Sequence, residues 1–120
     1  MTRRLSIAAL LCAAGLAHAE TPAITRAEVT RLLDTVAQSK CTFNRNGTWY
    51  DANSASKHLR DKFDYLDKRN MLVNTESFIE KGAARSSSSG KEYKIFCPGG
   101  TAVPSAAWLT TELDKLRGPK

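Results

Sequence analysis

The N-terminal segment constrains the fold of this chain more than any other feature. Two arginines at positions 3 and 4 precede an apolar run over residues 5–16, and the sequence Ala-His-Ala follows, ending at Ala19. A basic start, a short apolar stretch and small residues at an A-x-A site are typical of a secretory signal peptide. We therefore predict cleavage after Ala19, which leaves 120 − 19 = 101 residues in a periplasmic or extracellular space. That length suits one compact domain over residues 20–120.

Other interpretations of the N-terminus are disfavoured by simple criteria. The apolar run has 12 residues, whereas a bilayer-spanning helix needs about 20, and we expect no transmembrane segment after signal removal. Cys12 follows Leu11, where a lipoprotein would carry a small residue.

The charge of the mature chain does not favour a nucleic-acid partner. Loss of the two arginines leaves a net charge of 16 − 12 = +4, and the remaining cations are interspersed with acids. A nucleic-acid site would need clustered cations with stacking aromatic residues, so we expect no nucleic-acid partner.

Two cysteines, Cys41 and Cys97, remain after processing, and export favours their pairing. Cys41 begins a short alternating stretch, and Cys97 ends another over residues 92–97. In an antiparallel pair, the start of one strand lies opposite the end of its neighbour. We therefore predict a disulfide that joins two neighbouring antiparallel strands on their core side. Chain-entropy models assign such a crosslink about 3–4.5 kcal/mol of stabilisation.

Turn and helix signals organise the rest of the chain. Asn46-Gly47 predicts a hairpin that returns through residues 48–50. Trp49 and Tyr50 should then point to opposite faces of the strand. Apolar spacing predicts helices over about 26–38 and 52–68, a shorter one after residue 74 and a last one from Pro104 to residue 117. The pattern Thr25-x-x-Glu28 is typical of a capping box for the first helix. The expected fold class is α+β, a two- or three-stranded antiparallel sheet packed by about four helices.

The candidates for catalysis and metal binding are few. His58 is the one histidine left after processing, and no nucleophile-elbow spacing places a serine beside it. One histidine and two oxidised cysteines are a poor metal-ligand set, so we expect neither metal nor cofactor. The segment Ser89-Gly90-Lys91 lacks the Gly and Ser/Thr that a phosphate-binding loop requires at positions 85 and 92. The serine run 86–89 is interpreted as a polar connector, and binding of a small anion by its amides stays open.

A set of short motifs occurs in order over about residues 25–116. The motifs are Cys41-x-Phe43-x-Arg45-Asn46-Gly47-x-x-Tyr50, Ala55-x-x-His58-Leu59-Arg60-x-Lys62, Thr75-Glu76-x-Phe78-Ile79, Gly90-Lys91-x-Tyr93 and Pro104-Ser105-x-x-Trp108-Leu109. This ordered set resembles the YfeK-like family of small periplasmic bacterial proteins with a domain of unknown function. The resemblance implies export and one compact domain, and it supplies no catalytic residues.

Two functional hypotheses follow. The first is a non-enzymatic, monomeric envelope protein that binds another envelope protein through exposed polar and aromatic side chains. Its candidate interaction surface comprises residues of the hairpin, of the helix 52–68 and of the serine connector, namely Arg45, Asn46, Gly47, Trp49, His58, Arg60, Ser88, Ser89, Gly90 and Lys91. The alternative is a small envelope hydrolase or anion-ligand-binding protein that uses His58, Arg60 and the Ser86–Ser89 loop. This alternative predicts that these groups converge on one pocket.

Overall fold

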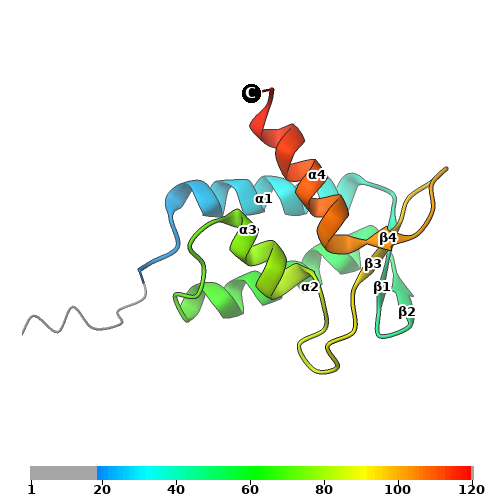
Figure 1. The fold of residues 1–120 in the computed structure, drawn as a ribbon, viewed down its shortest axis with the longest axis horizontal. Coiled ribbons are helices and arrows are strands. Elements are labelled where there is room, and N and C mark those ends of the chain that lie inside the picture. The colour runs from blue at the N-terminus through cyan, green and yellow to red at the C-terminus, as the bar shows by residue number, and fades with distance from the viewer. Residues whose placement is uncertain (1–18, 120) are drawn as a thin grey trace, which may run out of the picture.

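The structure of the chain is a computed structural model that describes residues 19–119, so the predicted signal peptide lies outside the described residues except for Ala19. It has the predicted α+β class, with helices packed on an antiparallel sheet that lies toward one end of the helical layer (Figure 1). The elements, in chain order, are α1 (Ala23–Gln38), β1 (Thr42–Arg45), β2 (Thr48–Tyr50), α2 (Ala52–Lys68), α3 (Thr75–Phe78), the π-helix η1 (Ile79–Ala83), β3 (Lys94–Phe96), β4 (Val103–Pro104) and α4 (Ser105–Arg117).

The sheet has one more strand than the two or three predicted. Its order is β2-β1-β3-β4, and all neighbours are antiparallel. The extra strand, β4, has two residues, of which Val103 pairs with Ile95 and Pro104 with Lys94. A two-residue strand is too short to display alternation, and proline is accepted only at a sheet edge, which is where β4 lies. Strand β4 leads directly into α4, so it sets where that helix begins.

The predicted disulfide is confirmed. Thr42 pairs with Phe96 across β1 and β3, and Cys41 and Cys97 are the next residues outward, with their Cα atoms 4.1 Å apart. The bond links the start of one strand to the end of its antiparallel neighbour, as the strand parity required. It closes the sheet at the end opposite the hairpin turn.

Strand alternation separates a buried face of the sheet from an exposed one. Phe43, Tyr93 and Ile95 are buried against the helices. On the other face Trp49 and Phe96 are 48% and 44% exposed and pack edge to face. The prediction that Trp49 and Tyr50 face opposite ways is confirmed, since Tyr50 pairs with buried Phe43 while Trp49 pairs with Asn44.

The apolar stripes of α1 and α2 form the centre of the core. The core combines side chains from all four α-helices, from the loop before α3 and from the buried face of the sheet. Its fully buried large side chains include Leu32, Leu33, Leu72, Phe78, Ile95, Leu109 and Leu113. No helix in the described range 19–119 is long and apolar enough to cross a membrane.

The predicted capping box at the start of the first helix is wrong. Helix α1 begins at Ala23, after Pro22, and Thr25 is buried inside the helix with 2% exposure. Proline before the first turn already favours a helical start, so the helix begins earlier than the threonine suggested. Glu28 instead accepts hydrogen bonds from Thr75 at 2.7 Å and from Arg117 at 2.8 and 2.9 Å. This glutamate therefore ties α1 to the start of α3 and to the end of α4.

Candidate functional site

A cleft with basic and polar walls lies where the β1–β2 hairpin, α2 and the serine connector meet. It comprises two adjoining cavities of about 290 and 690 Å³. We call the smaller cavity the apolar lobe, because Phe43, Ala55 and Leu59 contribute to its walls. The larger, which Ser86, Ser87 and Ser88 help to line, is the serine lobe. Side chains that line both lobes form the basic cleft proper, namely Arg45, Tyr50, His58, Asp61 and Tyr93.

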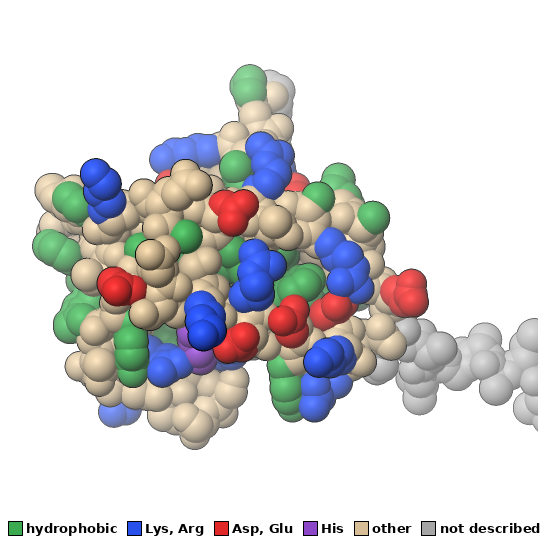
Figure 2. Space-filling view, turned by 180° about the vertical axis from the view of Figure 1, so that it is seen from behind, with side chains coloured by type: hydrophobic (Ala, Val, Ile, Leu, Met, Phe, Trp, Pro, Cys, Tyr) green, Lys and Arg blue, Asp and Glu red, His purple; other side chains and the backbone are tan. Residues whose placement is uncertain are grey.

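Arg45, the last residue of β1, anchors the basic cleft. Its Nη1 lies 2.6 Å from Nδ1 of His58, which projects from α2. Its Nη2 donates a hydrogen bond to the Tyr50 hydroxyl at 3.2 Å, and the guanidinium carbon lies 4.7 Å from the centre of the Tyr50 ring. The hairpin places these residues together, because its tight turn brings β2 back beside the end of β1. Figure 2 shows histidine surface among Lys and Arg side chains on this face of the molecule.

The contact with Arg45 determines which nitrogen of His58 carries the proton. A guanidinium can only donate, so Nδ1 accepts and the proton of the neutral ring is on Nε2. That nitrogen lies 3.3 Å from the Tyr93 hydroxyl oxygen and donates to it. The ammonium of Lys62 donates to the same oxygen at 3.2 Å. With both lone pairs of the phenol occupied, the Tyr93 hydroxyl hydrogen remains available for a different acceptor.

Burial and neighbouring charges keep this network in one protonation state. Burial, followed by the charges of Arg45 and Lys62, lowers the pKa of His58 from its usual 6.5, with a smaller opposing effect from Asp61. The imidazole is therefore neutral at pH 7, as the hydrogen-bond assignment requires. Burial, and then the charge of Arg45, also lowers the pKa of Lys62. Burial raises the pKa of Tyr93, so its phenol stays protonated.

The serine connector is fastened to the hairpin turn by Asn46. The Asn46 amide donates to the Ser86 hydroxyl at 3.3 Å, and its carbonyl oxygen accepts from the Ser89 hydroxyl at 2.5 Å. The Ser86 oxygen also accepts from the backbone amides of Ser88 and Ser89, both at 3.3 Å. Ser86 is 5% exposed and thus forms the fixed base of the loop. The connector interpretation of the serine run fits these contacts, in which hydroxyl groups stabilise the turn.

One residue that lines the apolar lobe carries a buried polar group without a partner in the described part of the chain. Ser105, the first residue of α4, lines this lobe and is 1% exposed. Its Oγ is buried and has no hydrogen-bond partner among the described residues. Its backbone amide donates to the Tyr93 carbonyl at 2.9 Å. The start of α4 is therefore attached to the same residue whose phenol faces the basic cleft.

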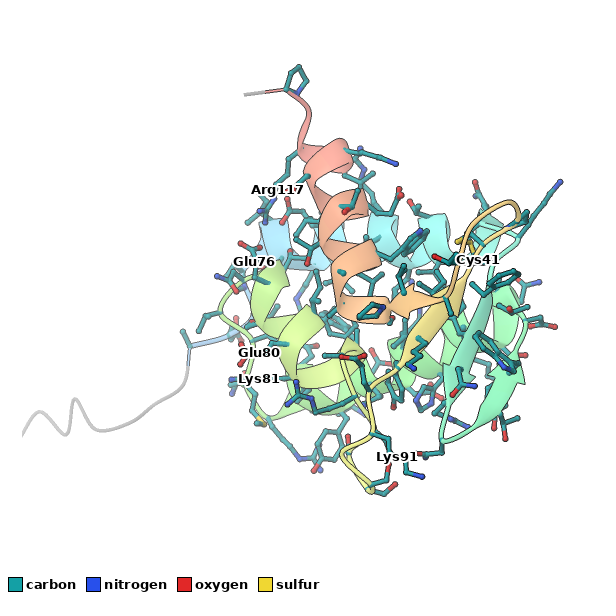
Figure 3. All side chains as sticks on the ribbon, turned by 45° about the vertical axis from the view of Figure 1, so that its right-hand side comes forward. Cys41, Glu76, Glu80, Lys81, Lys91 and Arg117 are labelled. Atoms are coloured by element: carbon teal, nitrogen blue, oxygen red, sulfur yellow. A yellow bond between two sulfur atoms is a disulfide. The ribbon has the colours of Figure 1, made fainter. Side chains whose placement is uncertain are left out.

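The residues proposed from the sequence fall into two groups. The structure places Arg45, Asn46, His58 and Ser88 on the walls of the cleft. The other six are not among the residues that line either lobe. Gly47 forms the hairpin turn with φ +85°, Trp49 lies on the exposed sheet face, and Arg60 is on α2 away from both lobes. Ser89 and Gly90 belong to the turn of the connector, and Lys91 lies at the surface beside it (Figure 3).

The set that the sequence linked to hydrolysis does not converge as a whole. His58 shares the serine lobe with Ser86, Ser87 and Ser88, whereas Ser89 and Arg60 do not line it. Nδ1 of His58 binds Arg45, and Nε2 binds Tyr93. Within residues 19–119 neither ring nitrogen forms a hydrogen bond with a serine. Lys62, Tyr93 and Ser105 were missed as site residues. Lys62 follows His58 by one helical turn, so the two side chains lie on the same face of the helix. Tyr93 is two residues before Ile95, so alternation places both on the core side of the sheet. The sequence could therefore have indicated both residues.

Metal binding finds no support in the described part of the chain. There, no group of three or more His, Cys, Asp or Glu side chains is arranged to hold a metal ion. The cleft instead offers donors: a guanidinium, an ammonium and two phenols. Groups of this kind recognise acceptors, and above all anions.

Comparisons with known proteins identify relatives but no activity. The sequence profile of a family of unknown function (DUF5329) matches residues 23–117. The chain is 40% identical over 68 residues to the uncharacterized protein YfeK of Salmonella typhimurium (strain LT2), an alignment that covers 56% of this chain and 55% of YfeK. The chain thus spans about half the length of this curated relative. No solved structure matches.

Proposed function

The chain belongs to the family of unknown function DUF5329, and from that premise we propose that it is an exported binding protein whose basic cleft holds an anionic ligand. The proposal adopts the anion-ligand binding that was part of the alternative hypothesis from the sequence, in place of the protein-binding role of the first hypothesis. Of the ten residues predicted as a contact surface, four line this cleft: Arg45, Asn46, His58 and Ser88. The ligand chemistry is that of a carboxylate or phosphate group, whose oxygens accept the hydrogen bonds that the cleft can donate.

The arrangement of donors around Tyr93 is the observation that carries this proposal. Arg45 and Lys62 are half-buried cations whose side-chain partners are neutral: His58, Tyr50 and Tyr93. Within the described residues neither cation forms an ion pair, while Arg26 and Arg117 each bind carboxylates. Partly desolvated positive charge without a counter-ion is unfavourable, so an incoming anion gains more here than at the exposed surface.

Asp61 is the acidic side chain that lines both lobes, and it limits where the anion sits. Asp61 is exposed, so it belongs to the rim of the cleft. An anion is therefore expected at the Arg45–Tyr93–Lys62 side, away from this carboxylate. Repulsion from Asp61 falls with salt because exposed charges are screened within about 10 Å at 0.1 M ionic strength.

Export is the second part of the proposal and rests on the N-terminal pattern and the disulfide. The bond between Cys41 and Cys97 suits an oxidising compartment. Expression of the full chain in a Gram-negative host, followed by intact-mass analysis of the periplasmic fraction, tests it. We expect the mass of a chain that begins at Glu20, and a cytoplasmic, uncleaved product would contradict the proposal.

Anion binding is tested by titrating sodium phosphate and sodium acetate into ¹⁵N-labelled protein at constant ionic strength. Saturable shifts should appear at Tyr93 and Arg45, and the variant Arg45→Gln should weaken the affinity by about tenfold or more, as expected for a charged hydrogen bond. Arg60→Gln is the matched control, because it also replaces an arginine by glutamine, but at a position on α2 that lines neither lobe. Absence of saturable shifts in the wild type, or equal losses in the two variants, would contradict the proposal.

A further inference from the structure

We infer that the ligand of the basic cleft is an organic anion with a compact apolar body, and that Ser105 hydrogen-bonds a second polar group on that body. The inference rests on the proposed function, and it names the class of ligand. It predicts an aromatic or branched aliphatic carboxylate that carries a hydroxyl or carbonyl group remote from the acid.

The continuity of the two lobes supports an extended ligand. Arg45, His58 and Tyr93 line both lobes, so a group bound between these side chains borders the apolar lobe directly. The lobe has a volume of about 290 Å³, and apolar cavities of about 150 Å³ accommodate benzene. A bare phosphate or acetate ion would leave this space and its apolar walls exposed to water.

The walls of the apolar lobe define what can fill it. Phe43, Ala55 and Leu59 are buried core side chains that present carbon surface to the lobe. A sugar or another polyhydroxylated ligand would lose hydrogen bonds to water against such surface. An aromatic ring or branched alkyl group would instead gain from the removal of apolar area from water.

Ser105 supplies the second, independent observation. Buried hydroxyl groups almost always have a hydrogen-bond partner, yet the Ser105 Oγ is buried without one in the described part of the chain. The residue is held in place by the hydrogen bond that its backbone amide donates to the Tyr93 carbonyl and by its position at the start of α4. A hydroxyl can both donate and accept, so it suits a ligand hydroxyl or carbonyl group. The site thus has an anion contact at Tyr93 and a neutral polar contact at Ser105, separated by apolar walls.

The test compares simple probes by calorimetry or NMR titration. The probes are acetate, benzoate, the three hydroxybenzoate isomers and neutral benzyl alcohol. Benzoate should bind about tenfold or more tightly than acetate, because the ring is buried, and benzyl alcohol should bind more weakly than benzoate. At least one hydroxybenzoate isomer should bind several-fold more tightly than benzoate.

Serine variants identify the residue that recognises the added hydroxyl group. Ser105→Ala should abolish the advantage of the best hydroxybenzoate over benzoate. Ser54→Ala is the matched control, since Ser54 lines the same lobe but is exposed. Ser105→Ala removes an unpartnered hydroxyl and should remain folded, and Ser105→Cys, which nearly preserves the volume, provides a second variant with a weak hydrogen-bonding group.

The outcomes separate this inference from the proposed function. If phosphate, acetate and benzoate all fail to bind, the proposed function fails. If phosphate or acetate binds at Arg45 but benzoate binds no more tightly than acetate, the anion site stands and the apolar-body assignment is overturned. If the hydroxybenzoate advantage survives in Ser105→Ala, or is lost equally in Ser54→Ala, the assignment of Ser105 is overturned.

Discussion

Nη1 of Arg45 lies 2.6 Å from Nδ1 of His58 and joins the end of β1 to the middle of α2. Because the guanidinium can only donate, this contact requires an unprotonated Nδ1, and protonation of His58 would break it. The contact therefore opposes the charged form of the imidazole. It also links the hairpin to Tyr93, because His58 Nε2 hydrogen-bonds the Tyr93 hydroxyl.

The stability of the fold should decrease on mild acidification because of His58. Its pKa in the folded chain is below the usual 6.5, so the unfolded chain binds this proton first. As pH falls through about 6.5, the unfolded state is favoured, and stability rises again with increasing pH. Urea unfolding between pH 5.5 and 7.5 should show this slope in the wild type and a smaller slope in His58→Gln. An unchanged slope, or NMR evidence for a proton on Nδ1, would contradict the assignment.

Glu28 should stabilise the fold at neutral pH and lose this contribution in acid. Its hydrogen bond with Arg117, with further help from Thr75, lowers its pKa from 4.5 to about 2. The stabilisation is therefore present above pH 4.5 and is lost as pH falls toward 2. Glu28→Gln should cost about 1 kcal/mol at pH 7, the order expected for charged hydrogen bonds near the surface, and should flatten the acid limb of the unfolding curve.

A neighbouring acid provides the control for this prediction. Figure 3 shows Arg117 beside Glu76, to which it also donates at 2.6 Å, with Glu80 farther along the helix. Glu80→Gln removes an exposed carboxylate near the same helix and should leave the urea midpoint nearly unchanged. Equal decreases in the free energy of unfolding for Glu28→Gln and Glu80→Gln would contradict the prediction. They would show that the net charge, and not the contact of Glu28 with Thr75 and Arg117, determines the stability.

Removal of the disulfide should be the most damaging covalent change. The bond joins residues 56 positions apart, and chain-entropy models assign about 4 kcal/mol to a loop of that size. The double variant Cys41→Ala/Cys97→Ala should lose a comparable free energy of unfolding, and the wild type should lose the same amount in reductant. Reactive thiols in protein purified from the periplasm without reductant would contradict the pairing.

Gly82 in the π-helix η1 should not tolerate a side chain. A Cβ at this position would lie 2.9 Å from Cε2 of Phe78 and 3.1 Å from Cδ1 of Leu66, both in the core. Gly82→Ala should therefore destabilise the fold by about 1–3 kcal/mol, the usual cost of overpacking. Gly100→Ala is the control, because its nearest contact, the Cys97 carbonyl at 3.5 Å, is an ordinary one. Equal unfolding midpoints for the two variants would contradict the packing argument.

Local patterns in the sequence determined the hairpin, the buried stripe of α2 and the facing of the two cysteines. Asn46-Gly47 specifies a tight turn through its backbone preferences, and alternation assigns Phe43 and Ile95 to one face before any contact is known. These patterns depend on residues that are near one another in the chain, or on the regular spacing of apolar residues along a helix or strand. The capping box at Thr25 misled because Pro22, three residues earlier, also starts a helix.

The tertiary structure alone decided the site. Arg45 ends β1, His58 lies on α2 and Tyr93 immediately precedes β3, with separations of 13 and 35 residues. No periodicity links such positions, and their contacts depend on the angle at which α2 crosses the sheet. Ser105 joined the lobe because β4, a two-residue strand without a sequence signature, fixed the start of α4. The sequence by itself determined the hairpin, most of the helices and the disulfide, because those depend on local geometry. Only the packing of distant elements decided which polar groups face one another.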